Sequence, residues 1–354
     1  MKIEKTRDLT LPTGVLGLAL APGGDKLYAA CMDGHVYDVD LATGAAVSFS
    51  AKHESFASGC AVLPDGETLI SSGYDGALLW HDTRGRHEIR RVAAHNFWSW
   101  QLALSPNSSL VASVTGQYLA GGEKYEPAAA PEATVKVFDA RSGDLLHSFA
   151  HLPPVLSAAF SPDNAHLATA NMMGEVCIWD LRTGNRAAQF TTADFTSWGI
   201  IKSPHYCGGI YALAFAPDGM SILCCGMGPM KDPMAGNGKM TWQRWAWNEA
   251  PPKTIAQISD GDGGAGLMET LAHHPDGQSF LMAGRQAQGR WNAAIFSTSD
   301  GALLASLDTK SRVTRAIYEP DGKTLFLAAA VGQPKRESDG SWPPYGRVHI
   351  VTLS

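Results

Sequence analysis

A short element recurs seven times along the 354 residues of the chain and constrains its fold more than any other feature. Each copy has an apolar stretch, a turn of the type Pro-Asp-Gly or a close variant, and a second apolar stretch. The turn prolines are Pro22, Pro64, Pro106, Pro162, Pro217, Pro275 and Pro320, at intervals of 42, 42, 56, 55, 58 and 45 residues. Seven such units indicate a repeat architecture that extends from one end of the chain to the other.

The fourth unit shows what one copy contains. Its sequence, VLSAAFSPDNAHLATANMMGEVCIWDLRTGNRAAQF, holds four segments of strand length: 155–160, 166–171, 175–180 and 186–190. Small and β-branched residues in partial alternation, interrupted by Pro-Asp and Thr-Gly, are typical of a strand–turn–strand meander. Four antiparallel strands in each of seven units predict an all-β fold, a single seven-bladed β-propeller.

The seventh unit lacks one strand. It supplies only three strand-like segments: 313–318, 324–330 and 347–353. A sheet with an open edge exposes unpaired N–H and C=O groups, so a propeller must close its last blade. Residues 2–9 precede the first inner strand at 15–20 and are free to pair with 347–353. We therefore expect the N-terminal strand to close the ring, with residues 1–354 forming one domain.

Two further patterns recur in the units. Segments 36–44 (VYDVDLATG), 137–143 (VFDARSG) and 177–184 (CIWDLRTG) have the same form. His53, His95 and His151 each lie ten residues before the residue that precedes a turn proline. In these features the chain resembles the WD-repeat β-propeller family, as a divergent member. The resemblance covers essentially the whole chain.

This resemblance implies a structural role for the three histidines. In WD-repeat blades a histidine at this position joins a hydrogen-bonded network with a Ser or Thr, an Asp and a Trp of the same blade. The matching positions are Ser71 to Gly73, Asp75 and His81 in the second blade, Ser113 and Phe138 in the third, and Thr169, Met173 and Trp179 in the fourth. His81 stands in place of the Trp and Met173 in place of the Asp, so no blade has the full set.

The long insertions all emerge on one face of the predicted ring. If the strands of a blade are a to d, the b–c loop and the d–a link to the next blade lie on one face, and the a–b and c–d turns lie on the other. The insertions of the first kind are 115–133, 226–240, 284–290 and 331–346, and those of the second kind are 191–209 and 259–266. Long loops on a rigid scaffold often carry function. We call this the loop-rich face and expect the binding site there.

The loop-rich face is also predicted to be rich in aromatic and Met residues, which are favoured at the centres of protein interfaces. The candidate partner-binding residues are Phe97, Trp98, Phe195, Trp198, Tyr206, Met230, Met234, Trp291, Trp342 and Tyr345. The alternative is that these side chains pack on one another and cover the ring.

Composition and charge exclude several classes of function. The net charge of −6 disfavours a protein that tracks the nucleic-acid backbone. No stretch has the roughly 18 apolar residues of a membrane span. The six cysteines form no CxxC pair or regular disulfide framework, which predicts a reducing, cytoplasmic environment. We therefore expect neither nucleic acid nor membrane as a partner.

The sequence contains no motif for catalysis or cofactor binding. It lacks a Gly-x-Ser-x-Gly elbow and a phosphate loop that ends in Gly-Lys-Ser/Thr. His273 and His274 are adjacent and would point to opposite faces of a strand. We therefore predict no catalytic residue, no metal and no cofactor, and a protein-interaction scaffold as the function. The alternatives are a propeller enzyme or small-ligand binder that uses the central channel, and a non-catalytic subunit of a larger enzyme complex.

Overall fold

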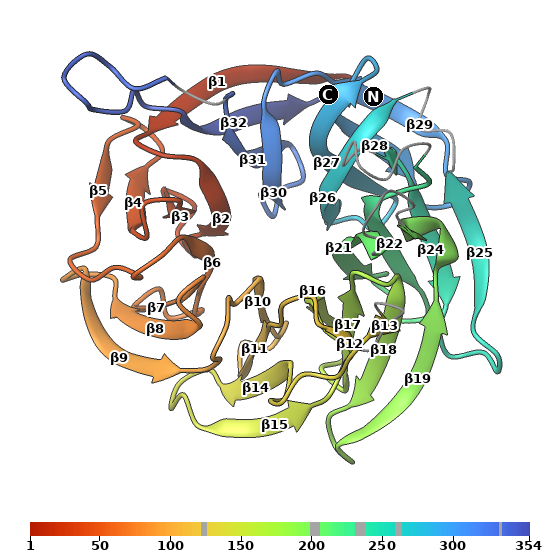
Figure 1. The fold of residues 1–354 in the computed structure, drawn as a ribbon. Helices are drawn as coiled ribbons and strands as arrows, with labels where there is room; N and C mark the ends of the chain where they lie inside the picture. The colour runs from red at the N-terminus through yellow and green to blue at the C-terminus, as the bar shows by residue number, and fades with distance from the viewer. Residues whose placement is uncertain (122–125, 199–205, 231–237, 259–263, 333–334) are drawn as a thin grey trace.

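Seven antiparallel sheets stand around a central axis (Figure 1). The computed structural model describes residues 1–121, 126–198, 206–230, 238–258, 264–332 and 335–354. Within these ranges the chain forms strands and one short 3-10 helix, η1 (Ala193–Phe195), and no α-helix. The prediction of an all-β, seven-bladed propeller is confirmed. No helix in the described part of the chain has the length and apolar character needed to cross a membrane.

Blades 1 to 4 follow the predicted plan of four strands. Blade 1 consists of β2 (Val15–Leu20), β3 (Lys26–Cys31), β4 (Val36–Asp40) and β5 (Ala46–Ser48), and blade 2 of β6 (Ala57–Val62), β7 (Thr68–Gly73), β8 (Ala77–Asp82) and β9 (His87–Ala93). Blade 3 consists of β10 (Gln101–Leu104), β11 (Leu110–Val114), β14 (Val135–Asp139) and β15 (Leu145–Phe149). Blade 4 consists of β16 (Val155–Phe160), β17 (His166–Asn171), β18 (Glu175–Asp180) and β19 (Asn185–Thr191). The insertion of blade 3 carries a small hairpin, β12 (Ala120–Gly121) with β13 (Glu126–Pro127).

Blades 5 and 6 each gain an extra strand. Blade 5 consists of β20 (Thr196–Trp198), β21 (Tyr206–Phe215), β22 (Ile222–Met227), β24 (Trp242–Ala246) and β25 (Lys253–Ile258). Blade 6 consists of β23 (Gly238–Lys239), β26 (Ala265–His273), β27 (Ser279–Gln288), β28 (Ala293–Ser297) and β29 (Leu303–Leu307). Most of the predicted insertion at 284–290 is therefore strand, because Ala265 pairs with Gln288 and lengthens the hairpin of β26 and β27.

The seventh blade joins the two ends of the chain. It consists of β30 (Arg312–Tyr318), β31 (Thr324–Ala330), β32 (Gly346–Leu353) and β1 (Ile3–Leu11). Ile3 pairs with Leu353 and Leu11 with Gly346, so β1 covers the whole edge of β32. The chain ends lie side by side, where the Lys2 N–H donates to the Ser354 carbonyl over 2.7 Å (Figure 1). The prediction that the N-terminal strand closes the last blade is confirmed.

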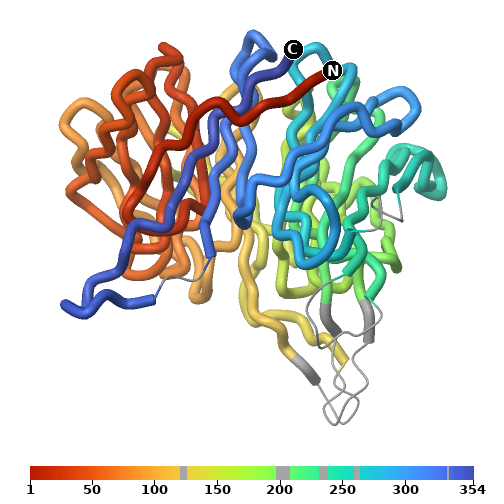
Figure 2. The backbone as a smooth tube through the Cα atoms, turned by 90° about the horizontal axis from the view of Figure 1, so that it is seen from above, coloured from red at the N-terminus to blue at the C-terminus, as the bar shows by residue number. Residues whose placement is uncertain are grey.

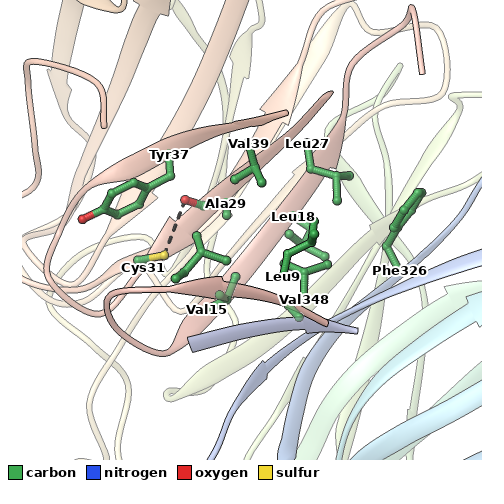
Figure 3. Packing of buried hydrophobic residues seen from close by; sticks show 12 residues of the cluster. Leu9, Val15, Leu18, Leu27, Ala29, Cys31, Tyr37, Val39, Phe326 and Val348 are labelled. Carbon is green, nitrogen blue, oxygen red and sulfur yellow. Dashed lines mark hydrogen bonds between the residues drawn. The ribbon is translucent and has the colours of Figure 1, made fainter. Parts of the chain in front are cut away.

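The hydrophobic core lies between neighbouring blades. In the cluster of Figure 3, Leu9 and Val348 of blade 7 pack with Leu18, Leu27 and Val39 of blade 1. All five side chains are at most 4% exposed. Removing the apolar faces of adjacent sheets from water is the main force that holds the ring together. Ring closure by β1 therefore contributes core side chains as well as backbone hydrogen bonds.

The recurrent turn sequence has a conformational cause. Gly66, the last residue of a Pro-Asp-Gly turn, has a φ of 70°, in the left-handed region that glycine enters without steric cost. Asn164 holds the same place in blade 4 with a φ of 62°. Asn is the non-glycine residue that best tolerates this conformation. The repeat that marks the units is thus a requirement of the turn between the first two strands of each blade.

The two faces of the ring differ as the strand order requires. The described parts of the b–c and d–a connections, including the β12–β13 hairpin and residues 335–345, protrude on one side (lower side of Figure 2). The short a–b and c–d turns lie on the opposite side. The loop-rich face of the sequence-based prediction is this first side.

Candidate functional site on the loop-rich face

A buried histidine network ties blade 2 to its incoming link. His53 Nδ1 lies 2.9 Å from Asp75 Oδ1, and His53 Nε2 lies 2.9 Å from Ser71 Oγ. Ser71 Oγ in turn lies 2.9 Å from Nε2 of His81, at the position of the family tryptophan. Although burial alone would raise the pKa of Asp75, the bond from His53 lowers this pKa to about 2. The network therefore joins the d–a link, the second strand and the b–c turn of one blade.

Blade 3 has a network without a carboxylate on the histidine. His95 Nε2 lies 2.8 Å from Ser113 Oγ, which is also 2.8 Å from Ser99 Oγ. Burial lowers the pKa of His95 to about 3, so this imidazole is neutral at physiological pH. Phe138, at the position of the family tryptophan, is 2% exposed and packs in the core between blades 2 and 3.

In blade 4 a different acid takes the place of the missing Asp. His151 Nδ1 and the indole N–H of Trp179 both lie 2.9 Å from Thr169 Oγ1. His151 Nε2 lies 3.1 Å from Oε1 of Glu175, two residues after the buried Met173.

The same corner contains a cluster of potential metal ligands. His151, Glu175 and Cys177 have ligand atoms within 4.8 Å of one another, the one such group found in the described ranges. Glu175 Oε1 contacts the histidine and its other oxygen accepts a hydrogen bond from Gln189. Burial raises the pKa of the Cys177 thiol to about 12, which keeps it protonated. The cluster is accounted for as part of the blade 4 network.

The structure contains a further network that the sequence patterns missed. His349 on β32 has its Nε2 2.8 Å from Ser311 Oγ and its Nδ1 2.6 Å from Asp8 Oδ1 on β1. In blade 6 the corresponding link is held by an amide, because Thr309 N–H donates to Asn292 Oδ1 over 2.8 Å. The sequence signal that could have revealed this network is Asp8, since the predicted closing strand 2–9 places it beside the strand that carries His349. These networks fix the connections on which the loop-rich face is built.

An aromatic cluster lies on the loop-rich face above blades 2 and 3. Its members, from the two d–a links and the b–c turn of blade 2, are Phe56, Tyr74, Phe97, Trp98 and Trp100. The rings of Tyr74 and Trp98 are stacked with centroids 4.7 Å apart, and those of Phe97 and Trp98 with centroids 5.1 Å apart. Trp100 meets Trp98 edge to face at 5.2 Å. Phe56 and Trp98 remain 41% and 40% exposed, so the cluster presents apolar surface to solvent.

A groove of about 1110 Å³ crosses the same face at blades 6, 7 and 1. One wall is the long insertion of blade 7, with Trp342, which is 53% exposed, and Tyr345. The other walls include Met32 of blade 1 and Arg285 and Lys310 of blade 6 and its link to blade 7. Tyr345 Oη lies 3.7 Å from Met32 Sδ, which connects the insertion to blade 1. The groove therefore combines aromatic side chains with charged side chains of both signs, since Asp33 and Asp308 also line it.

The predicted partner-binding residues separate into three groups. Trp98 and Trp342 are exposed, and Phe97, Met230 and Tyr345 are half-buried. Phe195 and Trp291 were wrongly assigned to the surface, since they are 0% and 2% exposed. Phe195 packs in the core between blades 4 and 5, and Trp291 in the core between blades 5 and 6. A large aromatic residue beside a loop can be drawn into the core by the fold, and the sequence carries no signal for this. The side chains of Trp198 and Tyr206, and Met234 as a whole, lie outside the described part of the chain.

The central channel contains a cavity of about 110 Å³ near the loop-rich face. Each blade contributes to the cavity wall a residue at or next to the start of the regular pairing between its first and second strands. These residues, in blade order, are Leu16, Ser58, Trp100, Leu156, Tyr211, Glu269 and Thr314. Glu269 forms a bidentate pair with Arg312, with N–O distances of 2.8 and 2.7 Å. Arg312 lines both this cavity and the groove.

Comparisons with known proteins support the repeat. The family model "WD domain, G-beta repeat" matches residues 143–180, from the end of blade 3 through the third strand of blade 4. Nuclear distribution protein PAC1 of Arthroderma otae is 29% identical over 182 residues, which are 47% of this chain and 38% of that protein. Eukaryotic translation initiation factor 3 subunit I of Bombyx mori is 30% identical over 158 residues, which are 44% of this chain and 43% of that protein.

A third relative matches over a longer stretch. Telomerase protein component 1 of Mus musculus is 22% identical over 334 residues, which are 92% of this chain and 11% of that protein. In all three comparisons the match spans less than half the length of the relative.

Proposed function

This chain belongs to the WD-repeat β-propellers, and from that premise we propose that it is a non-catalytic scaffold that binds a protein partner through its loop-rich face. The observation that carries the proposal is that the aromatic cluster and the groove both open on this face. Exposed stacked aromatic rings are unfavourable in water and are a common mark of an interaction surface. The opposite face consists of short turns whose side chains are mostly polar.

The aromatic cluster supports recognition of a folded or apolar partner surface. Trp and Tyr are the residues that most often dominate binding energy, because they bury a large area with few rotatable bonds. Phe56 and Trp98 stand at the outer edge of the cluster, while Tyr74 and Trp100 lie beneath them and line the channel cavity. The rings are held by their mutual stacking, which reduces the entropy lost on binding.

The groove supports recognition of a partner segment. Its volume of about 1110 Å³ exceeds what a single side chain fills. Trp342 and Tyr345 offer apolar contact along one wall, and the ion pair of Lys310 with Asp308 offers charged groups on another. We propose that a protruding loop or chain end of the partner lies here while the aromatic cluster contacts the partner body.

The cysteines support a cytoplasmic location. The side chains of five of the six are described and are buried free thiols: Cys31, Cys60, Cys177, Cys224 and Cys225. Free cysteines in this number are usual for a reducing compartment. We propose that the protein and its partner meet in the cytoplasm.

The test is capture of a partner by the tagged full chain from its native host, with identification by mass spectrometry. Trp342→Ala, and Phe56→Ala combined with Trp98→Ala, should each weaken binding of the purified partner by about thirtyfold, which corresponds to roughly 2 kcal/mol for one anchor residue. Met220→Ala is the matched control, because Met220 is 55% exposed and lies in an a–b turn on the opposite face. Undiminished binding by both loop-rich-face variants at unchanged melting temperature would refute the proposal.

A further inference from the structure

At one position of the channel wall, two blades have a long polar side chain where the other five have a small residue. The first strand of each of these five blades has a β-bulge, where its pairing with the second strand shifts by one residue. In blades 1, 2, 4, 5 and 6 the residue directly after the bulge is small: Gly17, Gly59, Ser157, Ala212 and Thr270. In blade 7 the residue directly after the bulge is Arg315. In blade 3 the equivalent residue is Gln101, which pairs with Val114 at the end of the second strand. Both long side chains line the 110 Å³ cavity.

Arg315 is a cation without a counter-charge. It makes no hydrogen bond or ion pair with any residue in the described ranges, although the other channel arginine, Arg312, is fully paired with Glu269. Glu269 and these two arginines are the charged residues of the cavity wall, so this wall carries a net positive charge. Burial lowers the pKa of Arg315, and no carboxylate opposes that effect. An unpaired charge on a half-buried side chain is unfavourable unless an anion or water compensates it.

Several of the remaining polar groups of the cavity can donate hydrogen bonds. The Gln101 side-chain oxygen accepts the Ala158 N–H over 2.6 Å, which leaves the amide NH2 of Gln101 as the free end. Tyr74 and Tyr211 also line this cavity, and neither hydroxyl has a hydrogen-bond partner among the described residues. Both carboxylate oxygens of Glu269 are already engaged by Arg312. The cavity thus offers several donors beside the unpaired guanidinium, and its one carboxylate is already paired.

We propose that the central channel binds a small oxyanion, of the carboxylate or phosphate class, between Arg315 and Gln101. Such an anion accepts hydrogen bonds at every oxygen and neutralises the unpaired guanidinium. Gln101, Ser157 and Thr270, which hold this position in blades 3, 4 and 6, each bond the backbone of the next blade through the side chain. Arg315 makes no such bond to the described residues, and Gln101 keeps its amide NH2 free beside the cavity, so both side chains have groups left for a ligand. This inference goes beyond the proposed scaffold function and does not depend on it.

The experiment measures binding of inorganic phosphate and of acetate to the full chain by calorimetry, with chloride at matched ionic strength as the background. We expect saturable binding of at least one anion and a rise in melting temperature that follows its concentration. Phosphate binding identifies a phosphate-class ligand, and acetate binding alone identifies a carboxylate. Arg315→Gln should weaken binding by about tenfold or more, as expected for loss of a hydrogen bond from a charged group.

Two further variants keep the test decisive. Gln101→Leu should also weaken binding and leaves the arginine in place if Arg315→Gln fails to fold. Arg290→Gln is the control, because Arg290 is exposed and does not line the cavity. Absence of saturable binding of either anion, or equal binding by wild type and folded Arg315→Gln, would overturn the proposal. Partner capture is measured separately, so either proposal can fail alone.

Discussion

The histidine networks of blade 2 and blade 7 contain the same three chemical groups but assemble them differently. In blade 2, His53, Ser71 and Asp75 come from one stretch of chain. In blade 7, His349 bonds Ser311 from the same blade and Asp8 from the opposite end of the chain, 341 residues away in sequence. One network is a local motif, and the other exists only after the ring has closed.

This difference indicates where the ring is most vulnerable. A local network can form within its blade before the rest of the propeller is complete, because few residues separate its members. The blade 7 network needs β1 to find β32, which is a contact of the longest possible range. The two networks contribute similar bonds in the folded state, yet they depend on different folding events.

Deletion of residues 2–9 should lower stability the most, because it disrupts the blade 7 network and leaves the blade 2 network unchanged. The variant loses the β1–β32 pairing, the buried Leu9 and the carboxylate on His349, while the blade 2 network stays intact. We expect a sharp fall in melting temperature and self-association through the exposed edge of β32. Thermal unfolding and gel filtration measure both effects. An unchanged melting temperature with monomeric elution would contradict the role assigned to β1.

Asp75→Asn and Asp8→Asn compare the two networks directly. The Asp75 side chain is 10% exposed and that of Asp8 is 37% exposed. A charged hydrogen bond contributes more where water cannot replace it, so we expect Asp75→Asn to cost about 2 kcal/mol and Asp8→Asn about 1 kcal/mol. Urea unfolding gives both values. A larger loss for Asp8→Asn would mean that the closing network contributes more stability than the local one.

Acid should lower the stability of the protein through His95 of blade 3, a histidine that has no carboxylate beside it. His95 has a pKa of about 3 in the folded chain, whereas an unfolded histidine titrates near 6.5. Between these values the unfolded chain binds a proton that the folded chain does not, so stability falls as the pH is lowered through this window. One such histidine costs about 2 kcal/mol at pH 5. His95→Gln should therefore lose less stability than wild type between pH 7 and pH 5, and parallel pH curves would exclude this role.

The sequence predicted most of the fold because its signals are local. The four strands of blade 4 were placed within one residue, since Pro162 and Gly184 mark its turns. The network of His349 was missed because its Asp lies in another part of the chain. Burial of Phe195 and Trp291 could not be predicted either, since it depends on how blade 5 packs against blades 4 and 6.

The candidate site was predicted only in outline. Strand order fixed the loop-rich face, and composition pointed to its aromatic residues. Phe56 and Tyr74 were not predicted as site residues, because each is a single aromatic residue in a short connection. Phe56 contacts Tyr74 with tilted rings and Tyr74 stacks on Trp98, and these contacts arise where two blades meet.

Hydrogen exchange on the chain with and without its captured partner tests the central claim most directly. If the loop-rich face binds the partner, amides around Phe56, Trp98 and Trp342 should gain protection. The a–b and c–d turns, such as those at Gly66 and Gly184, should exchange at unchanged rates. Protection confined to these short turns, with the aromatic cluster and the groove unaffected, would contradict the proposed binding face.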